Sequence, residues 1–259
     1  MLIVGISGRK QSGKSTSTNL ILSLYIAELG LSNTVYLNDE GEIIVSDLLG
    51  DTNYAGVFDI IKNYNTNDFI ISKFMNNLKQ HINIYSVADP LKRDICMNLL
   101  GLTYSQCYGS DVDKNTLTKI KWSNIPGYNR SSERDITEEY MTGREVMEVI
   151  GTDIFRTIKE DIWVSRTIDI ALKNNKALSI ISDCRFPNEI EEIKNRGGKV
   201  IRLMRDPFNT KTLSESALDK DNYDWDNFNY IIDNRDMSLL DMSIKIQEVI
   251  SDITINNNK

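Results

Sequence analysis

Short apolar runs alternate along the chain with longer stretches in which apolar residues recur every three or four positions. The runs indicate strands and lie at residues 2–6, 83–87, 177–182, 199–204 and 228–232. The longer stretches indicate helices and lie at residues 13–29, 67–80, 90–100, 142–172, 187–196 and 237–253. Strands that alternate with helices are typical of a parallel sheet with helices on both faces. The pattern therefore predicts an α/β protein with three layers and about five strands.

Two stretches do not fit this alternation. At residues 34–80, two short apolar runs flank the polar segment 38–42, which predicts a hairpin followed by a polar, Asn-rich connection. Residues 103–142 are polar and aromatic, and a long irregular stretch of this kind is often a lid or a binding loop. Its cations are Lys114, Lys119, Lys121, Arg130 and Arg134. We predict one domain over residues 1–259, with an inserted subdomain at about 34–80 and a lid at about 103–142.

The net charge argues against polyanionic surfaces as partners. The chain has a formal charge of −7, and 26% of its residues are charged and 41% hydrophobic. An acidic protein has no nonspecific attraction for nucleic acid or anionic lipid, so we expect neither a nucleic-acid polymer nor a membrane as partner. The first residues already form an apolar strand, with no basic segment or long apolar run before it. We therefore expect a cytoplasmic protein.

Cysteine and histidine usage excludes several kinds of site. The three cysteines, Cys96, Cys107 and Cys184, show no C-x-x-C spacing, and His81 is the only histidine in the sequence. A zinc site built from these residues is not expected, nor is a Cys–His or Ser–His nucleophile. We expect reduced, buried thiols.

Residues 8–15 read GRKQSGKS, which is a complete phosphate-binding loop between a predicted strand and a predicted helix. In such a loop, backbone N–H groups and the helix N-terminus face the phosphates, the lysine spans the β- and γ-phosphates, and the serine can hold Mg²⁺. The sequence therefore predicts a P-loop NTPase fold that binds ATP and Mg²⁺. The predicted binding residues are Gly8, Lys10, Ser12, Gly13, Lys14, Ser15 and Thr16.

Polar residues follow two of the predicted strands, at the sheet edge where ligands of parallel sheets bind. Asp89 and Lys92 follow one strand, and Asp183, Arg185 and Glu189 follow the other. Asp183 could reach Mg²⁺ together with Ser15, or it could cap a helix. The guanidinium of Arg185 could hold a second phosphate, or it could pair with Glu189 four residues later.

A third group of charges lies in the predicted helix at 142–172. Its apolar residues recur at helical spacing and indicate a core face, which leaves Arg144, Arg156 and Arg166 unexplained. Phosphoryl transfer needs such cations because negative charge spreads over the transferred group. Each of these arginines could equally be a solvated residue on the helix surface.

These clusters, in this order, resemble the deoxynucleoside monophosphate kinases of tailed bacteriophages, relatives of the adenylate and thymidylate kinase group. The matching segments are residues 7–16, 88–92, 141–145, 151–153, 161–163, 183–189 and 214–215. The resemblance implies that the acceptor is surrounded by Lys92, Arg144, Gly151, Thr152, Trp163, Asp183, Arg185 and Glu189. It implies catalytic roles for Lys14, Arg144, Asp183 and Arg185. It also implies ATP and a nucleoside monophosphate as partners, and a possible homodimer.

The expected activity is transfer of the γ-phosphoryl group of ATP to a deoxynucleoside 5′-monophosphate. Two alternatives remain: a small-metabolite kinase such as dephospho-coenzyme A kinase, and a nucleotide-binding regulator that transfers nothing. Trp163 could stack on a base or pack in the core. The insertion at 34–80 could be a flap on the acceptor side or an oligomer contact.

Overall fold

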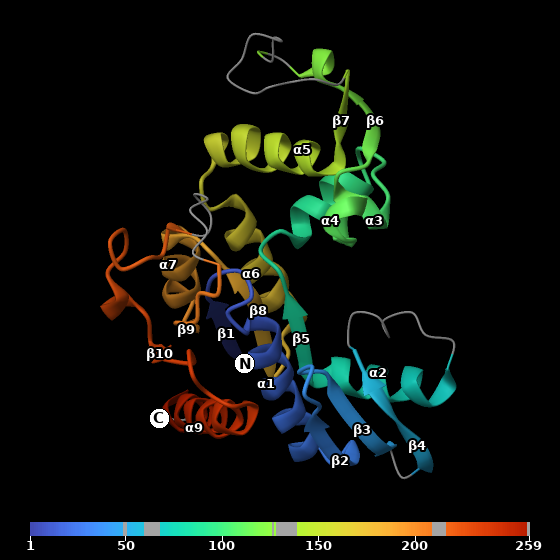
Figure 1. Cartoon of the computed structure of the whole chain (residues 1–259), viewed down its shortest axis with the longest axis vertical. Helices are drawn as coiled ribbons and strands as arrows, with labels where there is room; N and C mark the ends of the chain where they lie inside the picture. The colour runs from blue at the N-terminus through green and yellow to red at the C-terminus, as the bar shows by residue number, and fades with distance from the viewer. Residues whose placement is uncertain (49–50, 60–67, 126, 128–138, 209–215, 258–259) are drawn as a thin grey trace. The chain divides into compact units, whose positions relative to one another are not determined.

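The computed structural model describes residues 1–48, 51–59, 68–125, 127, 139–208 and 216–257 (Figure 1). It contains two compact units. Residues Met1–Ser86 and Ile168–Lys259 form the first unit, and residues Val87–Thr167 form the second.

The first unit is built on a sheet of five parallel strands. The strands are β1 (Leu2–Ser7), β5 (Ile82–Tyr85), β8 (Leu178–Cys184), β9 (Lys199–Leu203) and β10 (Tyr230–Ile232). Their order is β10-β9-β1-β8-β5, and each neighbouring pair is parallel. The prediction of a parallel, five-stranded sheet is confirmed. Because β1 lies in the middle, the loop that follows it emerges at the centre of the sheet edge.

Helices cover both faces of this sheet. On one face, Leu2, Val4 and Ile6 of β1 belong to the main hydrophobic cluster together with residues of α1 (Lys14–Glu28) and α9 (Leu239–Asn257). On the other face, Gly5 approaches α7 (Pro187–Asn195) so closely that a Cβ atom there would lie 2.9 Å from the Cδ1 atom of Ile193. This arrangement agrees with the predicted three layers.

Residues 32–81 add a second sheet to the first unit. The strands β2 (Ser32–Leu37), β3 (Ile43–Leu48) and β4 (Asp51–Phe58) are antiparallel, and α2 (Phe69–His81) follows them. The hairpin formed by β2 and β3 was predicted, whereas β4 was assigned to a polar connection. The residues of β4 alternate poorly between apolar and polar, and the strand forms through backbone pairing with β3. Ile43, Val45 and Phe58 join the main hydrophobic cluster.

The second unit consists of short elements. They are η2 (Pro90–Met97), α3 (Tyr104–Tyr108), α4 (Asp111–Lys114), β6 (Leu117–Lys121), η3 (Trp122–Asn124), β7 (Tyr140–Thr142), α5 (Gly143–Glu148) and η4 (Val149–Arg156). The expectation of an irregular stretch at 103–142 is therefore wrong for its described residues. Thr103 and Ser110 each form a capping box that fixes a short helix, and β6 pairs with β7 in an antiparallel sheet.

The single helix predicted at 142–172 is also wrong. The chain forms α5, then a π-helical turn in η4, and then α6 (Ile162–Asn174). The break before α6 lies at Asp161, whose carboxylate accepts a 2.6 Å hydrogen bond from the hydroxyl of Ser165. Aspartate favours the position just before a helix because its side chain satisfies groups of the first turn. The apolar spacing continues through this break, and it therefore concealed the boundary.

The remaining predicted helices correspond to α1, α2, η2, α7 and α9, with ends that shift by a few residues. A short 3₁₀-helix, η5 (Trp225–Asn227), precedes β10. Among the residues that the structure describes, no helix combines the length and apolar character needed to cross a bilayer.

The three cysteines are expected to resist thiol reagents in the native protein. All three are free and buried, as predicted. Burial raises the pKa of Cys96 to about 12, and it also raises the pKa of Cys184 well above its ordinary value. A raised pKa keeps the thiol protonated at pH 8, where only the thiolate would react. An aromatic disulfide reagent should label none of the cysteines at pH 8 and all three in guanidinium chloride. Rapid labelling of the native protein would contradict this.

Candidate active site

The loop between β1 and α1 has the backbone geometry of an anion cradle. Gly13 has φ 98°, and Gln11 has φ 57°, a conformation that costs energy for a residue other than glycine. A Cβ atom at Gly8 would lie 2.3 Å from the Oγ atom of Ser12, so only glycine fits there. The loop is therefore a tight turn that depends on glycine at both ends.

The start of α1 leaves backbone donors available to an anion. Gly13 occupies the N-cap position without a side-chain hydrogen bond, and the first turn carries no acidic residue. The first N–H groups of a helix lack partners within the helix and carry the positive end of its dipole. In addition, the hydroxyl of Ser12 is buried and has no hydrogen-bond partner among the described residues. These features fit a phosphate group at the loop.

Lys14 connects this loop to the end of β8. Its ammonium group donates hydrogen bonds to the carbonyl oxygens of Gly8 at 2.6 Å and Arg9 at 2.7 Å. It also lies 3.4 Å from the Oδ1 atom of Asp183. The lysine cation is thus held at the mouth of the loop by two carbonyl oxygens and a carboxylate, within reach of a phosphate in the cradle.

Asp183 and Arg185 form an ion pair where β8 ends. The Nε atom of Arg185 donates a 2.8 Å hydrogen bond to Asp183 Oδ2. Glu189, on the first turn of α7, is buried and accepts hydrogen bonds from the backbone N–H groups of Arg185 at 2.7 Å and Phe186 at 3.3 Å. The structure therefore brings Lys14, Asp183 and Arg185 together. The contacts of Glu189 hold the turn that carries Arg185.

Oxygen ligands for Mg²⁺ lie beside the phosphate loop. Ser15 is exposed on the first turn of α1, and Asp183 presents a carboxylate from β8. Hydroxyl and carboxylate oxygens suit Mg²⁺, which is usually held by one or two protein ligands together with phosphate oxygens. No group of three His, Cys, Asp or Glu side chains in the described part of the chain could bind a metal ion. Ser15 and Asp183 therefore fit a magnesium ion that arrives with a nucleotide.

Arg9 anchors the phosphate loop to the chain after β9. Its guanidinium group is buried and binds Asp219 through Nε, at 3.1 Å, and through Nη2. It also lies 3.2 Å from the carboxylate of Asp206. Arg202 of β9 approaches Asp219 to 3.9 Å and donates a 3.0 Å hydrogen bond to the hydroxyl of Ser7. Two arginines and two aspartates thus fix the first half of the loop.

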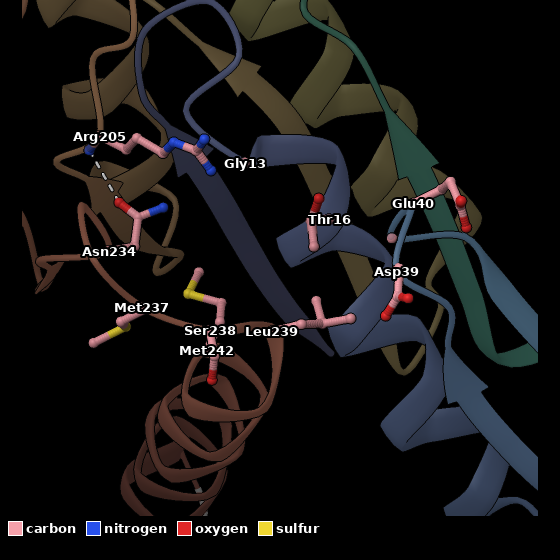
Figure 2. Close-up of a pocket in the computed structure, with 11 residues that line it drawn as sticks. Gly13, Thr16, Asp39, Glu40, Arg205, Asn234, Met237, Ser238, Leu239 and Met242 are labelled. Atoms are coloured by element: carbon pink, nitrogen blue, oxygen red, sulfur yellow. Dashed lines mark hydrogen bonds between the residues drawn. The ribbon is translucent and has the colours of Figure 1, made fainter.

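Asn234 anchors the second half of the loop. Its side chain is buried after β10 and donates a 2.7 Å hydrogen bond to the carbonyl oxygen of Ser12. It also accepts a 3.0 Å hydrogen bond from the backbone N–H group of Arg205 (Figure 2). This one amide therefore links the phosphate loop to the ends of two strands.

Replacing Asn234 with alanine is expected to destabilise the protein by about 1–3 kcal/mol, because it leaves the buried carbonyl oxygen of Ser12 without this donor. Urea unfolding monitored by circular dichroism would measure the change. The matched control is Asn222→Ala, since the amide of Asn222 donates a 2.9 Å hydrogen bond to the carbonyl oxygen of Ser216 at an exposed site. Equal losses in the two variants would show that the link to Ser12 adds nothing.

A pocket opens beside the first turn of α1 (Figure 2). Its volume is about 230 Å³. It begins at Gly13 and Thr16, and Met237, Leu239 and Met242 give it an apolar side. Its polar lining comes from Arg205, Asn234 and Ser238, and from Asp39, Glu40 and Gly41 of the turn between β2 and β3. A concave pocket with a predominantly polar lining and one apolar side can hold a small polar ligand.

Lys92 lies on η2 in the second unit. Its ammonium group lies 4.8 Å from the centre of the Tyr108 ring, a cation–π contact. The hydroxyl of Tyr108 donates a 3.1 Å hydrogen bond to Asp89, and burial together with this carboxylate raises the pKa of Tyr108. Two of the polar residues predicted at the end of β5 therefore contact the same tyrosine.

Arg144, at the start of α5, binds residues of α4 and its C-terminal cap. It donates hydrogen bonds to Asp111 at 2.7 Å and to Asn115 at 3.0 Å. The pair formed by Arg144 and Asp111 is exposed, and exposed ion pairs contribute little stability. Arg144 could therefore exchange these partners for a phosphate at small cost.

Gly151 and Trp163 lie in the interior of the second unit. A Cβ atom at Gly151 would lie 2.5 Å from the Cδ2 atom of Leu91, so a larger residue there would have to displace the Leu91 side chain. The indole N–H of Trp163 donates a 2.9 Å hydrogen bond to the carbonyl oxygen of Gly151, and the ring packs against Phe155. The structure thus places Trp163 in the core, whereas the neighbouring Thr152 is exposed.

Several residues singled out in the sequence lie outside the described part of the chain. They are Arg130 and Arg134 of the predicted lid, and Ser214 and Glu215. Lys10 is described and lies exposed on the phosphate loop.

Sequence reasoning missed Arg9, Asn234 and Asp39. Asn234 lies two positions after the end of the predicted strand at 228–232, so a search of the polar residues that follow each strand would have found it. Arg9 occupies a position of the loop pattern that any residue can fill, and nothing in the sequence indicates its partners. Asp39 was assigned to a hairpin turn, and only the fold brings that turn to α1.

Comparison with known proteins gives two matches. A family model described as deoxynucleotide monophosphate kinase matches residues 110–246, slightly more than half of the chain. A protein of Acanthamoeba polyphaga mimivirus named "putative deoxynucleotide monophosphate kinase" is 30% identical over 132 residues. The alignment covers 46% of this chain and 59% of the viral protein, so the chain spans less than two thirds of that relative. The matched residues 110–246 lie outside the phosphate loop and include Arg144, Asp183 and Arg185. The chain belongs to the deoxynucleotide monophosphate kinase family.

Proposed function

We propose that this protein transfers the γ-phosphoryl group of ATP to a deoxynucleoside 5′-monophosphate, giving a deoxynucleoside diphosphate and ADP. The observation that carries the proposal is the position of Lys14 between an uncapped helix start and the ion pair of Asp183 and Arg185. The phosphate loop supports a triphosphate donor, and family membership supports the class of acceptor.

The donor triphosphate would occupy the loop at the start of α1. Backbone N–H groups of residues 13–16 would bind its phosphates, and Lys14 would exchange its loop carbonyls for phosphate oxygens. The magnesium ion carried by the nucleotide would neutralise phosphate charge, with oxygen ligands from Ser15 and Asp183. The nucleoside would extend past Thr16 into the pocket, where Met237 and Met242 offer apolar surface to a base.

The acceptor monophosphate would be held by Arg185. With a second pKa of about 6, a phosphate monoester is mostly a dianion near neutral pH, so its oxygen can attack without a general base. A bond forms from that oxygen to the γ-phosphorus, and the bond from the γ-phosphorus to the β–γ bridging oxygen breaks, releasing ADP. The protein's task is alignment and stabilisation of charge.

The other predicted acceptor residues are Lys92, Arg144, Gly151, Thr152, Trp163 and Glu189. For three of them the structure supports a specific role. Arg144 has an exposed partner that it can exchange, whereas Trp163 supports the backbone at Gly151, and Glu189 supports the backbone at Arg185. We propose that the last two position neighbouring groups. Homodimer formation stays a prediction.

A direct assay tests the proposed function. Purified protein, ATP and Mg²⁺ would be mixed with each common deoxynucleoside or nucleoside monophosphate, or with dephospho-coenzyme A, and ADP would be measured against the rate without acceptor. Deoxynucleoside monophosphates should stimulate ADP formation strongly. Stimulation by dephospho-coenzyme A alone would favour the small-metabolite kinase. ATP binding without any acceptor-dependent turnover would favour a regulator.

A further inference from the structure

The turn between β2 and β3 is closed by its own hydrogen bonds and lies against the phosphate-loop helix. Asn38 closes the turn by hydrogen bonding to Glu42 through both its backbone and its side chain. The side-chain oxygen of Asn38 accepts a 2.8 Å hydrogen bond from the backbone N–H group of Glu42. Asn19 of α1 donates a 2.9 Å hydrogen bond to the carbonyl oxygen of Gly41. Gly41 is buried with φ 75°, and a Cβ atom there would lie 3.0 Å from Thr16 Oγ1. The insertion therefore reaches the side of the site that binds the donor.

Asp39 is the residue of this turn whose carboxylate faces the pocket. Asp39 and Glu40 both line the pocket and are both exposed. In Figure 2 the Asp39 carboxylate is directed toward the Leu239 side chain, whereas the Glu40 carboxylate is turned away from the other labelled residues. A carboxylate offers two oxygen atoms that accept hydrogen bonds.

The order of groups in a nucleotide decides what lies beside Asp39. In the proposed donor complex the phosphates bind at Gly13 and Thr16, and the sugar follows directly after the α-phosphate. The base lies further along the pocket, toward Met237 and Met242. The sugar is therefore the part of the donor beside Thr16, which the turn contacts through Gly41. The polar groups on the far side of a ribose are its 2′- and 3′-hydroxyls, which are hydrogen-bond donors.

We propose that Asp39 accepts hydrogen bonds from the 2′- and 3′-hydroxyls of the donor ribose. The inserted hairpin then belongs to the donor site and selects a ribonucleoside triphosphate over its deoxy analogues. This inference rests on the proposed function, because it takes the triphosphate position from it. It concerns the sugar of the donor and is independent of the acceptor base.

The test compares ATP, 2′-deoxy-ATP and 2′,3′-dideoxy-ATP as donors at a saturating acceptor concentration. In the wild-type protein, KM should rise about tenfold with each hydroxyl lost along this series, because each lost hydroxyl removes a hydrogen bond to a charged group. In Asp39→Ala the three donors should have the same KM, because the carboxylate that accepts from the ribose hydroxyls is gone. The kcat value and the KM of the acceptor should stay within about twofold of wild type.

Glu40→Ala serves as the matched comparison, since it removes the same charge from the same turn. Less negative charge near a triphosphate should favour all three donors equally, so KM should still rise from ATP to the dideoxy donor by the same factor as in the wild-type protein. The role of Asp39 would be overturned if KM still rose along the donor series in Asp39→Ala, or if it did not rise in the wild-type protein. Circular dichroism of each variant would check that it folds.

Calorimetric titration with the same three nucleotides separates this inference from the proposed function. One outcome is that the wild-type protein transfers no phosphoryl group but binds ATP more tightly than 2′-deoxy-ATP and 2′,3′-dideoxy-ATP, while Asp39→Ala binds all three equally. In that case the ribose contact is supported and the proposed kinase activity is wrong. If the wild-type protein transfers phosphoryl groups but discriminates none of the donors, the kinase activity stands and the ribose contact is wrong. No binding of any of them would overturn both.

Discussion

Lys14→Ala is expected to lower kcat/KM for phosphoryl transfer by about 10³-fold, because it removes the cation that is closest to the predicted β- and γ-phosphates. In the free protein the Lys14 ammonium group is bound to two loop carbonyls and lies 3.4 Å from Asp183. These partners hold the side chain near its working position. The loss should appear mainly in kcat, since the negative charge on the transferred group rearranges in the transition state.

Initial rates at varied ATP concentration would measure this effect. The matched control is Lys245→Ala on α9, since Lys245 is partly exposed and pairs with Glu248 one turn away. That variant should keep wild-type kcat and KM. In urea, Lys245→Ala should unfold within about 1 kcal/mol of wild type. Lys14→Ala should lose about 1–3 kcal/mol and stay folded, because the loop carbonyls lose the donor that satisfies them. A Lys14→Ala protein that is folded and turns over at the wild-type rate would contradict the role of the loop in transfer.

The sequence was sufficient for the parts of the fold that depend on local pattern. A strand–loop–helix unit was predicted from three adjoining signals, which are the apolar run at 2–6, the glycine-rich loop at 8–15 and the helical spacing at 13–29. Each signal supports the other two, because a phosphate-binding loop joins a strand to a helix. The parallel sheet followed from the alternation of apolar runs with helical spacing, and Asp183 and Arg185 followed from their place after a strand.

Other features depend on partners that are distant in the sequence. The strand β4 forms because β3 offers backbone groups to pair with, and its own residues do not alternate. The break before α6 depends on the side chain of Asp161 within a pattern of otherwise helical spacing. Short capped helices such as α3 have too few residues to show periodicity. In each case the deciding interaction is a hydrogen bond that the apolar pattern does not record.

In the candidate site, too, some residues follow from local sequence pattern and others depend on partners that are distant in the sequence. The phosphate loop and Asp183 belong to patterns along the chain, whereas the anchors of the loop come from elsewhere. Arg9 binds Asp219, which is 210 positions away, and Ser12 binds Asn234, which is 222 positions away. The contact of Gly41 with Asn19 is shorter in sequence, yet it depends on how the inserted sheet packs. The residues that position the site were therefore harder to predict than those assigned to its chemistry.

Arg185→Ala is expected to lower kcat/KM for the acceptor by about 10²- to 10³-fold while ATP binding stays within a few fold of wild type. The guanidinium group is only partly buried, and its Nε atom is engaged by Asp183. This contact orients a planar group that can bind a phosphate through two N–H donors. Arg185→Lys should recover only part of the rate, because an ammonium group keeps the charge and loses that paired geometry.

The variant also tests which substrate Arg185 serves. If Arg185 binds the acceptor, KM for the deoxynucleoside monophosphate should rise and Kd for ATP, measured by calorimetry, should not. If it served the donor, Kd for ATP should rise as well. Arg196→Ala is the matched control, since Arg196 lies at the end of α7 and pairs with Asp169 and Glu192 at the surface. Wild-type turnover of every nucleotide by Arg185→Ala would show that the acceptor phosphate is held by other residues.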